Sequence, residues 1–197
     1  MRRGFSRGQT GKPGEQVTGM ELTRLSREVL YKGRIIDLLV DQVQYPSGNR
    51  SVREVAHHPG GAAVVPVMDD GRVILVDQLR YPLERHILEL PAGKLSPGED
   101  PAVCAMRELE EETGWLGDPP SHLCSFYTTP GFCDEELHVY LARGLRPSPG
   151  GHKREEGEFT MNVHMLPFAE ALAMVGDGRI KDAKTIIGLL LAAPQCR

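Results

Sequence analysis

The chain has 197 residues, of which 40% are hydrophobic and 25% are charged, as expected for a globular protein with one well-buried core. Its formal net charge of -4 argues against a general nucleic-acid binder, and no apolar run reaches the length of a bilayer span. The first residues are basic but lack the apolar stretch of a secretory signal. We therefore expect a cytoplasmic protein that binds neither nucleic acid nor membrane.

The N-terminal part of the chain divides into a tail and a strand-rich segment. Residues 1–19 are rich in Gly, Arg, Gln and Thr and almost devoid of apolar residues, which predicts a disordered tail. Residues 20–58 contain alternating strand-like patterns around a turn at 46–49 and are expected to form a small antiparallel β-region. Because this region has too few apolar residues to bury alone, we expect it to pair with a second subunit in a homodimer.

Residues 59–197 interleave strand-like and helical patterns, which favours an α/β or α+β class with a mixed sheet covered by helices. Two apolar runs meet across Asp69-Asp70-Gly71, a strong signal for a β-hairpin. A strand is predicted at 136–142, a polar loop at 146–158, and two helices within 167–178 and 182–193, the last capped by Asp182. The four cysteines show no metal-ligand spacing and are expected to be free thiols.

A helix is predicted from Pro101 to Thr113, because Asp100 is a capping residue, Pro101 suits the first helical position and Gly114 suits the stop. Val103, Met106 and Leu109 recur at helical spacing and are expected to face the core.

The end of this helix concentrates negative charge. The stretch "RELEEETG" (107–114) places Glu108 on one face with Glu111 and Glu112, while Glu110 points elsewhere and is expected to be solvated. A glutamate run is usually only the charged face of an exposed helix. Here glycines precede the helix, Glu99 stands at its start and Arg107 offers a counter-charge. This context favours a site for a hard divalent cation such as Mg²⁺.

The stretch from Gly93 to Trp115 resembles the Nudix box: a glycine, five residues, a glutamate, seven residues, then R-E-(apolar)-x-E-E-x-G-(apolar). The resemblance implies the Nudix fold, an α/β/α sandwich with a mixed sheet, over residues 59–197. It also implies hydrolysis of nucleoside diphosphates linked to another moiety, with Mg²⁺ or Mn²⁺. Glu108 and Glu112 would be the chief metal ligands, with Glu111 close by and the backbone carbonyl of Ala92 as a further ligand. Glu99 and Arg107 would pair to fix the loop against the helix.

A second motif narrows the resemblance. Pro130 lies sixteen residues after Gly114, within P-G-(aromatic)-x-D-E, and resembles the ADP-ribose pyrophosphatase subfamily. The stretches "REVAHHPGGAAVV", "ILELPAGKL" and "GRIKDAKTIIGLLLA" extend the likeness over about residues 25–193. The resemblance implies that ADP-ribose and water give AMP and ribose 5-phosphate, with Pro130 and Gly131 at the substrate. Cys133 departs from the small polar residue expected at its position.

Other residues can be assigned roles in this reaction. Arg53 and Glu54 match a family segment that reaches the adenosine end of the substrate, commonly across a dimer interface; on their own they would be ordinary strand charges. Arg80 could clamp a phosphate, or be a surface arginine at a strand end.

A general base is also needed, and the loop "KREEGEFT" offers glutamates where closure over substrate is possible. We favour Glu156, with Glu155 second; the alternative is a merely solvated acidic loop. Four of the seven histidines, His57, His58, His138 and His164, are interpreted as structural or surface residues.

Two other functions remain open at this stage. One is the same chemistry on another diphosphate, such as a nucleotide sugar, a dinucleotide or a flavin dinucleotide. The other is a non-enzymatic nucleotide sensor, which the complete set of metal-binding carboxylates disfavours.

Overall fold

The computed structural model describes residues 15–16, 21–152 and 160–196, and the chain forms two compact units. Unit 1 comprises Met1–Pro59 together with Tyr127–Glu135, and unit 2 comprises Gly60–Phe126 together with Glu136–Arg197. Most of the tail predicted for residues 1–19 lies outside the described residues. Glu15–Gln16 form a short strand, β1, that pairs with the next strand.

Unit 1 is built on an antiparallel sheet in the order β1-β2-β3-β4, with β2 at Thr23–Lys32, β3 at Asp37–Gln44 and β4 at Arg50–His57. Leu39, Asp41 and Val43 alternate along β3 and are its buried residues. The buried carboxylate of Asp41 accepts two hydrogen bonds from Arg27, at 2.8 and 2.7 Å. The sheet thus buries a small apolar set, as its sequence predicts.

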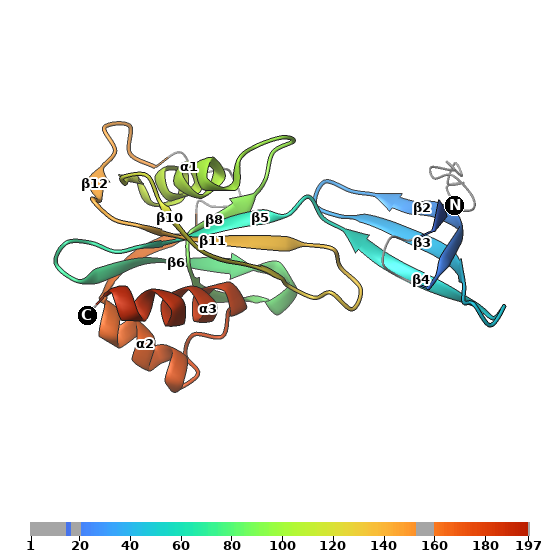
Figure 1. Ribbon diagram of the computed structural model, residues 1–197. Helices are drawn as coiled ribbons and strands as arrows, with labels where there is room; N and C mark the ends of the chain where they lie inside the picture. Colours follow the sequence, from blue (N-terminus) through green and yellow to red (C-terminus); the bar gives the residue numbers. More distant parts are fainter. Residues whose placement is uncertain (1–14, 17–20, 153–159, 197) are drawn as a thin grey trace. The chain divides into compact units, whose positions relative to one another are not determined.

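The central sheet of unit 2 has the order β10-β11-β5-β8 and is mixed. β5 (Gly61–Pro66) runs parallel to β11 (Glu136–Ala142) and antiparallel to β8 (Ala92–Lys94), and β10 (Ser121–Tyr127) forms the other edge. Figure 1 shows helix α1 (Pro101–Thr113) on one side of this sheet and α2 (Phe168–Gly176) and α3 (Ala183–Ala192) on the other.

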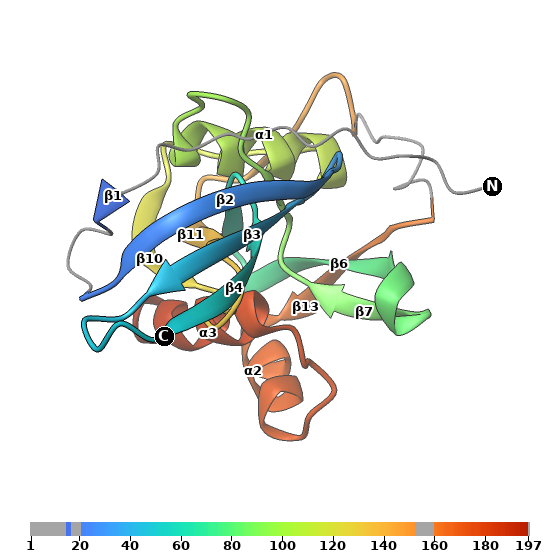
Figure 2. The same cartoon turned by 90° about the vertical axis from the view of Figure 1, so that its right-hand side faces the viewer.

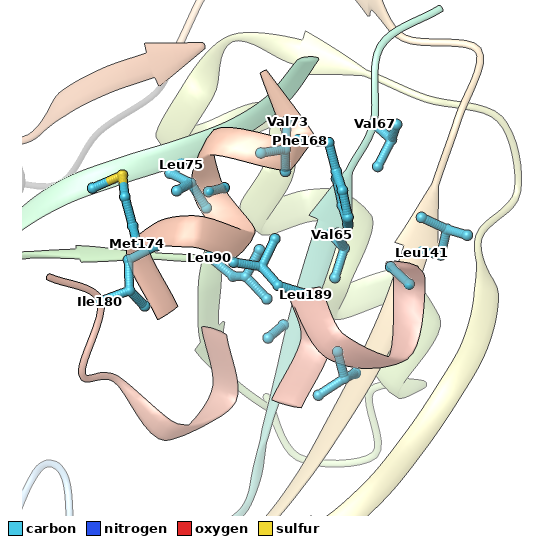
Figure 3. Close-up of a cluster of buried hydrophobic side chains, with 14 of the residues drawn as sticks. Val65, Val67, Val73, Leu75, Leu90, Leu141, Phe168, Met174, Ile180 and Leu189 are labelled. Atoms are coloured by element: carbon cyan, nitrogen blue, oxygen red, sulfur yellow. The ribbon is translucent and has the colours of Figure 1, made fainter. Parts of the chain in front are cut away.

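Every residue of β5 is buried, because the two faces of this strand contact different helices. Ala63 and Val65 belong to a core cluster with residues of α2 and α3, including Leu189 (Figure 3). Ala62 and Val64 belong to a second cluster, with Cys104, Ala105 and Leu109 of α1. The period of two in a strand sorts these side chains, so unit 2 is the α/β/α sandwich that the sequence predicts.

A second, antiparallel sheet has the order β13-β6-β7 and is visible in Figure 2. Its strands are β6 (Arg72–Arg80), β7 (Arg85–Glu89) and β13 (Asn162–Pro167), and the short helix η1 (Tyr81–Leu83) joins β6 to β7. Two further short strands pair with each other, β9 (Trp115–Leu116) and β12 (Arg146–Pro147), and the short helix η3 (Ala193–Gln195) follows α3.

The predicted helix ends are confirmed. Asp100 accepts a hydrogen bond from the Ala102 amide at 2.7 Å, and Gly114 ends α1 with a φ of 75°, a conformation that favours glycine. Asp182 accepts a hydrogen bond from the Thr185 amide at 3.0 Å at the start of α3.

Two sequence predictions need correction. The turn at Asp69–Gly71 forms, but the flanking runs meet only at a bridge between Val67 and Val73, because β5 and β6 belong to different sheets. Val103 does not face the core: it is 60% exposed, whereas Cys104 and Ala105 are buried. Among the described residues, no helix has the length and apolar character needed to cross a membrane.

Candidate active site

The acidic helix presents its carboxylates along rows of residues four apart. Cys104, Glu108 and Glu112 form one buried row, and Ala105, Leu109 and Thr113 form the other. Glu108 is 8% exposed and Glu112 only 2%. Two of the predicted metal ligands therefore lie on the face that packs against the sheet.

The glycine of the box lies directly against one of these carboxylates. A Cβ atom built on Gly93 would overlap the carboxylate of Glu108, so any side chain there would displace it. Next to Gly93 on β8, the amide of Ala92 donates a hydrogen bond to Oε2 of Glu112 at 3.1 Å. Strand β8 thus holds both buried carboxylates, and this explains why the spacing between Gly93 and the helix matters.

Arg107 relieves the repulsion among the acidic residues. Its Nη1 donates to Oε1 of Glu108 at 2.7 Å and to Oε2 of Glu111 at 2.8 Å. Its Nε and Nη2 donate to Glu99 at 2.9 and 3.1 Å, which confirms the predicted pair between the loop and the helix. These bonds, that to Glu99 above all, raise the pKa of Arg107, so the guanidinium stays charged.

Glu99 should make the stability of unit 2 sensitive to acid. The hydrogen bonds from Arg107, and then from the Ser96 amide, lower the pKa of Glu99 from 4.5 to about 2. A lowered pKa means that the stabilisation is complete above the ordinary value and is lost as the pH falls from 4.5 toward 2. We therefore expect Glu99→Gln to be less stable than wild type at pH 7, with the difference shrinking below pH 4. Urea unfolding of wild type and Glu99→Gln at pH 7 and below pH 4 measures this. A stability difference that does not change with pH would contradict the prediction.

The chemical type of the predicted ligand atoms suits a hard divalent cation. Glu108, Glu111, Glu112 and the Ala92 carbonyl offer only oxygen ligands, and two of the carboxylates are buried beside a glycine. In the part of the chain that the structure describes, no group of three or more His, Cys, Asp or Glu side chains is arranged to hold a metal ion. Arg107 is bonded to two of the four predicted ligands, and a cation binding there would replace it as their counter-charge.

A second charged cluster surrounds Glu89, which is 1% exposed. Arg80 donates to both of its oxygens, from Nε at 2.6 Å and from Nη2 at 2.7 Å, and Lys184 of α3 also donates to it. Lys184 lies 3.1 Å from Asp182, the residue that caps α3. Burial alone would raise the pKa of Glu89, but the bonds from Arg80 and the charge of Lys184 outweigh it and lower the pKa below 4.5.

From the sequence, Arg80 could be either a phosphate-binding residue or a surface arginine. The structure adds a contact that the sequence did not indicate, the bond between Arg80 and Glu89. Glu89 fixes the Nε and Nη2 edge of the guanidinium, which leaves Nη1 without a partner among the described residues. The bond to Glu89 raises the pKa of Arg80, and the charges of Glu89, Asp182 and Glu112 add to this effect. Arg80 is therefore part of a charged cluster around a buried carboxylate rather than an isolated surface arginine.

The predicted substrate residues meet in unit 1. Arg53, Glu54, Pro130 and Gly131 line one cleft of about 450 Å³, a size typical of small-molecule sites. Arg53 donates to Ser51 Oγ at 2.9 Å and to the hydroxyl of Tyr45.

The same cleft contains residues that the sequence reasoning did not single out: Arg24, Arg27, Tyr127 and Phe132. Tyr127 and Phe132 are 60% and 59% exposed, although large aromatic side chains are usually buried. Their positions on either side of Pro130 were the available signal. Together these residues offer flat apolar surfaces and positive charge in one hollow.

Two histidines hold the segment that carries Pro130. Nδ1 of His57 lies 2.6 Å from Oδ2 of Asp134, and the backbone amide of His58 donates to Oδ1 at 2.8 Å. The amide of Ala56 also donates to the Phe132 carbonyl at 2.8 Å. Burial would raise the pKa of Asp134, but the bonds from His57 and His58 lower it. The structural reading of these histidines is thus supported by named contacts.

Other predictions had different outcomes. Glu155 and Glu156 lie outside the described residues. Glu110 is not merely solvated, because the hydroxyl of Ser148 donates to it at 2.7 Å. His138 contacts Ser125 at 2.7 Å, and all four cysteines are free, as predicted.

Comparison with known proteins identifies the class. Residues 57–186 match the NUDIX domain, and residues 23–56 match the nucleoside diphosphate sugar hydrolase N-terminal domain. The chain belongs to the Nudix family and is a pyrophosphohydrolase that acts on nucleoside diphosphate derivatives.

Among its relatives, an ADP-ribose pyrophosphatase of Bacillus subtilis is 43% identical over 169 residues, which cover 86% of this chain and 91% of that protein. A methanol dehydrogenase activator of Bacillus methanolicus is 43% identical over 165 residues, covering 84% and 89%. A solved structure described as an ADP compounds hydrolase has a TM-score of 0.76 at 20% identity and covers 91% of this chain and 96% of that one. This structure supports the fold.

Proposed function

We propose that the chain hydrolyses the pyrophosphate bond of ADP-ribose, so that ADP-ribose and water give AMP and ribose 5-phosphate. The observation that carries this substrate is the cleft of unit 1, where Arg53, Glu54, Pro130 and Gly131 line one cavity with two exposed aromatic rings. Such a cleft offers stacking surfaces to a base and a cation to a phosphate. The similarity to an ADP-ribose pyrophosphatase over most of the chain supports the same substrate.

In this proposal the reaction depends on Mg²⁺ or Mn²⁺ held by Glu108, Glu111, Glu112 and the Ala92 carbonyl. When bound, the cation neutralises phosphate charge and activates a water molecule. The chain's own residues do the rest of the binding. Arg80, oriented by Glu89, offers its Nη1 edge to a phosphate oxygen, and Gly93 leaves room for the carboxylate of Glu108.

We assign the general base to Glu156, with Glu155 as the second choice. The carboxylates of α1 would be engaged with the cation, so a carboxylate from another segment is required to accept the proton of the attacking water. A loop can bring such a group to bound substrate and withdraw it after the reaction. The support for this assignment is the sequence pattern of the 153–159 segment.

We also propose that the chain forms a homodimer through residues 20–58. Unit 1 leaves several large apolar side chains exposed: Leu30, Tyr31, Ile35, Ile36 and Val52. A small sheet with so few buried residues gains stability by covering such side chains with a second copy. Light scattering of the full chain should give the mass of a dimer, and a monomer at micromolar concentration would contradict the proposal.

The substrate assignment is tested by Mg²⁺-dependent hydrolysis of a panel of ADP-ribose, nucleotide sugars, dinucleotides and nucleoside triphosphates, with products identified. AMP should form fastest from ADP-ribose. A different best substrate would retain the metal chemistry and overturn the assignment of ADP-ribose. Absence of turnover with every member would favour a nucleotide-binding protein without catalysis.

Arg53→Ala should raise KM for ADP-ribose by about tenfold or more and change kcat little, because it removes a charged hydrogen-bond donor from the cleft rather than from the acidic helix. Arg50→Ala is the matched control, since Arg50 is exposed at the start of the same strand and does not line the cleft. An unchanged KM for Arg53→Ala would show that this cleft does not bind the substrate.

A further inference from the structure

Unit 2 contains a second hollow that the proposed reaction does not use. It measures about 530 Å³ and is lined by residues of the β13-β6-β7 sheet and of the segment around α2, among them Asp77, Arg85, His86, His164, Met174 and Lys181. Figure 2 shows the three strands of this sheet side by side, with α2 nearby. Its volume falls within the range of small-molecule sites.

This hollow differs from the candidate active site by its lining, which includes neither Arg80 nor Glu89 nor any residue of α1. Val76 pairs with Glu89 and Asp77 pairs with Leu88, so neighbouring pairs point to opposite faces of the sheet. Asp77, His86 and Leu88 share one face, and Arg85 and Ile87 share the other with Glu89. Residues from both faces of the edge strand β7 therefore line the hollow.

The hollow carries excess positive charge. Neither Arg85 nor Lys181 has an ion pair or a side-chain hydrogen bond with any described residue. Arg179, which also lines the hollow, is neutralised by Asp177 at 2.7 Å. The one acidic lining residue, Asp77, lies 3.6 Å from Nδ1 of His86. Two cations thus remain uncompensated in a concave surface, where their fields add.

Part of the lining of the hollow is apolar. Met174 is 7% exposed, and Ile87 and Leu88 are half-buried. A free inorganic anion would gain nothing from these side chains, whereas an organic phosphate would bury its apolar or planar part against them.

We propose that this hollow is a second ligand site, which binds a small phosphate monoester of mononucleotide size. Arg85 and Lys181 bind the phosphate, Arg85 through its planar fork and Lys181 as a point charge. Ile87, Leu88 and Met174 pack against the base or sugar. AMP has this chemistry and serves as the probe, together with inorganic phosphate and adenosine, each of which carries half of it.

The test is an NMR titration of the full chain in the presence of a chelator, so that no cation can recruit phosphates to the acidic helix. We expect saturable AMP binding with amide shifts in residues 85–88 and 178–181. Adenosine and phosphate should bind at least tenfold more weakly than AMP. The double variant Arg85→Gln with Lys181→Gln should weaken AMP binding at least tenfold.

The matched control is Lys32→Gln with Arg50→Gln, which removes the same two charges from exposed positions of unit 1 and should leave AMP binding unchanged. The proposal is overturned if AMP does not bind, if no saturable shifts appear in residues 85–88 and 178–181, or if these shifts titrate in the Arg85 and Lys181 double variant as they do in wild type. Phosphate alone binding as tightly as AMP would overturn the nucleotide-sized ligand. None of these readouts depends on ADP-ribose hydrolysis, so the outcome is independent of the proposed function.

Discussion

Replacing Glu112 by Gln should lower kcat for Mg²⁺-dependent hydrolysis by a hundred- to a thousandfold, on the order of the loss of one preorganised electrostatic group. The substitution removes a charge without changing volume. Gln can still accept the hydrogen bond that the Ala92 amide donates, so the packing of α1 against β8 should survive. Steady-state kinetics and circular dichroism of the purified variant test both parts of this expectation.

Glu110→Gln is the matched control, because it is the same substitution two positions away on the same helix. Glu110 accepts a hydrogen bond from Ser148 and is half-buried, whereas Glu112 is buried against β8, so the variant should keep near wild-type turnover. Wild-type activity in Glu112→Gln would show that Glu112 is not a ligand of the catalytic metal ion.

Glu156→Gln should differ from Glu112→Gln by lowering turnover without weakening Mn²⁺ binding, which electron paramagnetic resonance can measure. This contrast separates the proposed base from the proposed metal ligands. If Glu155→Gln has the larger effect on turnover, the base is one residue earlier in the sequence.

Features that depend on neighbouring residues could be predicted from the sequence. The caps at Asp100 and Asp182 and the stop at Gly114 follow from local backbone chemistry, and all three appear in the structure. The pair between Glu99 and Arg107 and the α/β/α layering were implied by the resemblance to the Nudix box, and both appear in the structure.

Features that depend on distant segments could not be predicted in this way. The turn at Gly71 is local and formed, but whether β5 and β6 share a sheet depends on the partners of both strands. Val103 fitted a helical apolar pattern, yet it is not among the buried residues of α1, whereas Glu108 and Glu112 are. A count of apolar residues cannot show that carboxylates lie on the buried face of the helix. The exposed rings of Tyr127 and Phe132 likewise became meaningful only when the cleft was visible.

Glu89 is the clearest case of a long-range feature. In the sequence it is one glutamate in an apolar run, and nothing nearby indicates that Lys184, 95 residues later, donates to it. The next residue, Leu90, also contacts α3, because the Leu90 amide donates to Thr185 Oγ1 at 2.8 Å. The start of α3 is therefore attached to the end of β7 by both charge and backbone contacts.

Glu89→Gln should lower the free energy of unfolding by about 1.5–3 kcal/mol at pH 7, because it removes one of the two carboxylates that neutralise the largely buried Lys184 and leaves Asp182 as the other. Urea unfolding followed by fluorescence suits this test, since Trp115, the single tryptophan of the chain, lies in unit 2. The difference in unfolding free energy between variant and wild type should shrink as the pH falls below 4.5. The pKa of Glu89 is lowered in the folded protein, so only the ionised carboxylate stabilises the fold, and this stabilisation is lost as Glu89 becomes protonated.

A second variant separates charge from packing. Adding Lys184→Met to Glu89→Gln removes the buried cation that has lost its Glu89 partner and should recover part of the lost stability, while Arg80 keeps access to solvent. If the double variant is as unstable as the sum of the two single variants, the charges do not interact and Glu89 acts through packing alone. If stability is recovered but kcat is not, Glu89 acts in the reaction through Arg80, whose guanidinium it orients. The cluster would then connect the stability of unit 2 to its chemistry, because Glu89 both anchors α3 and positions Arg80, the residue proposed to bind a phosphate of the substrate.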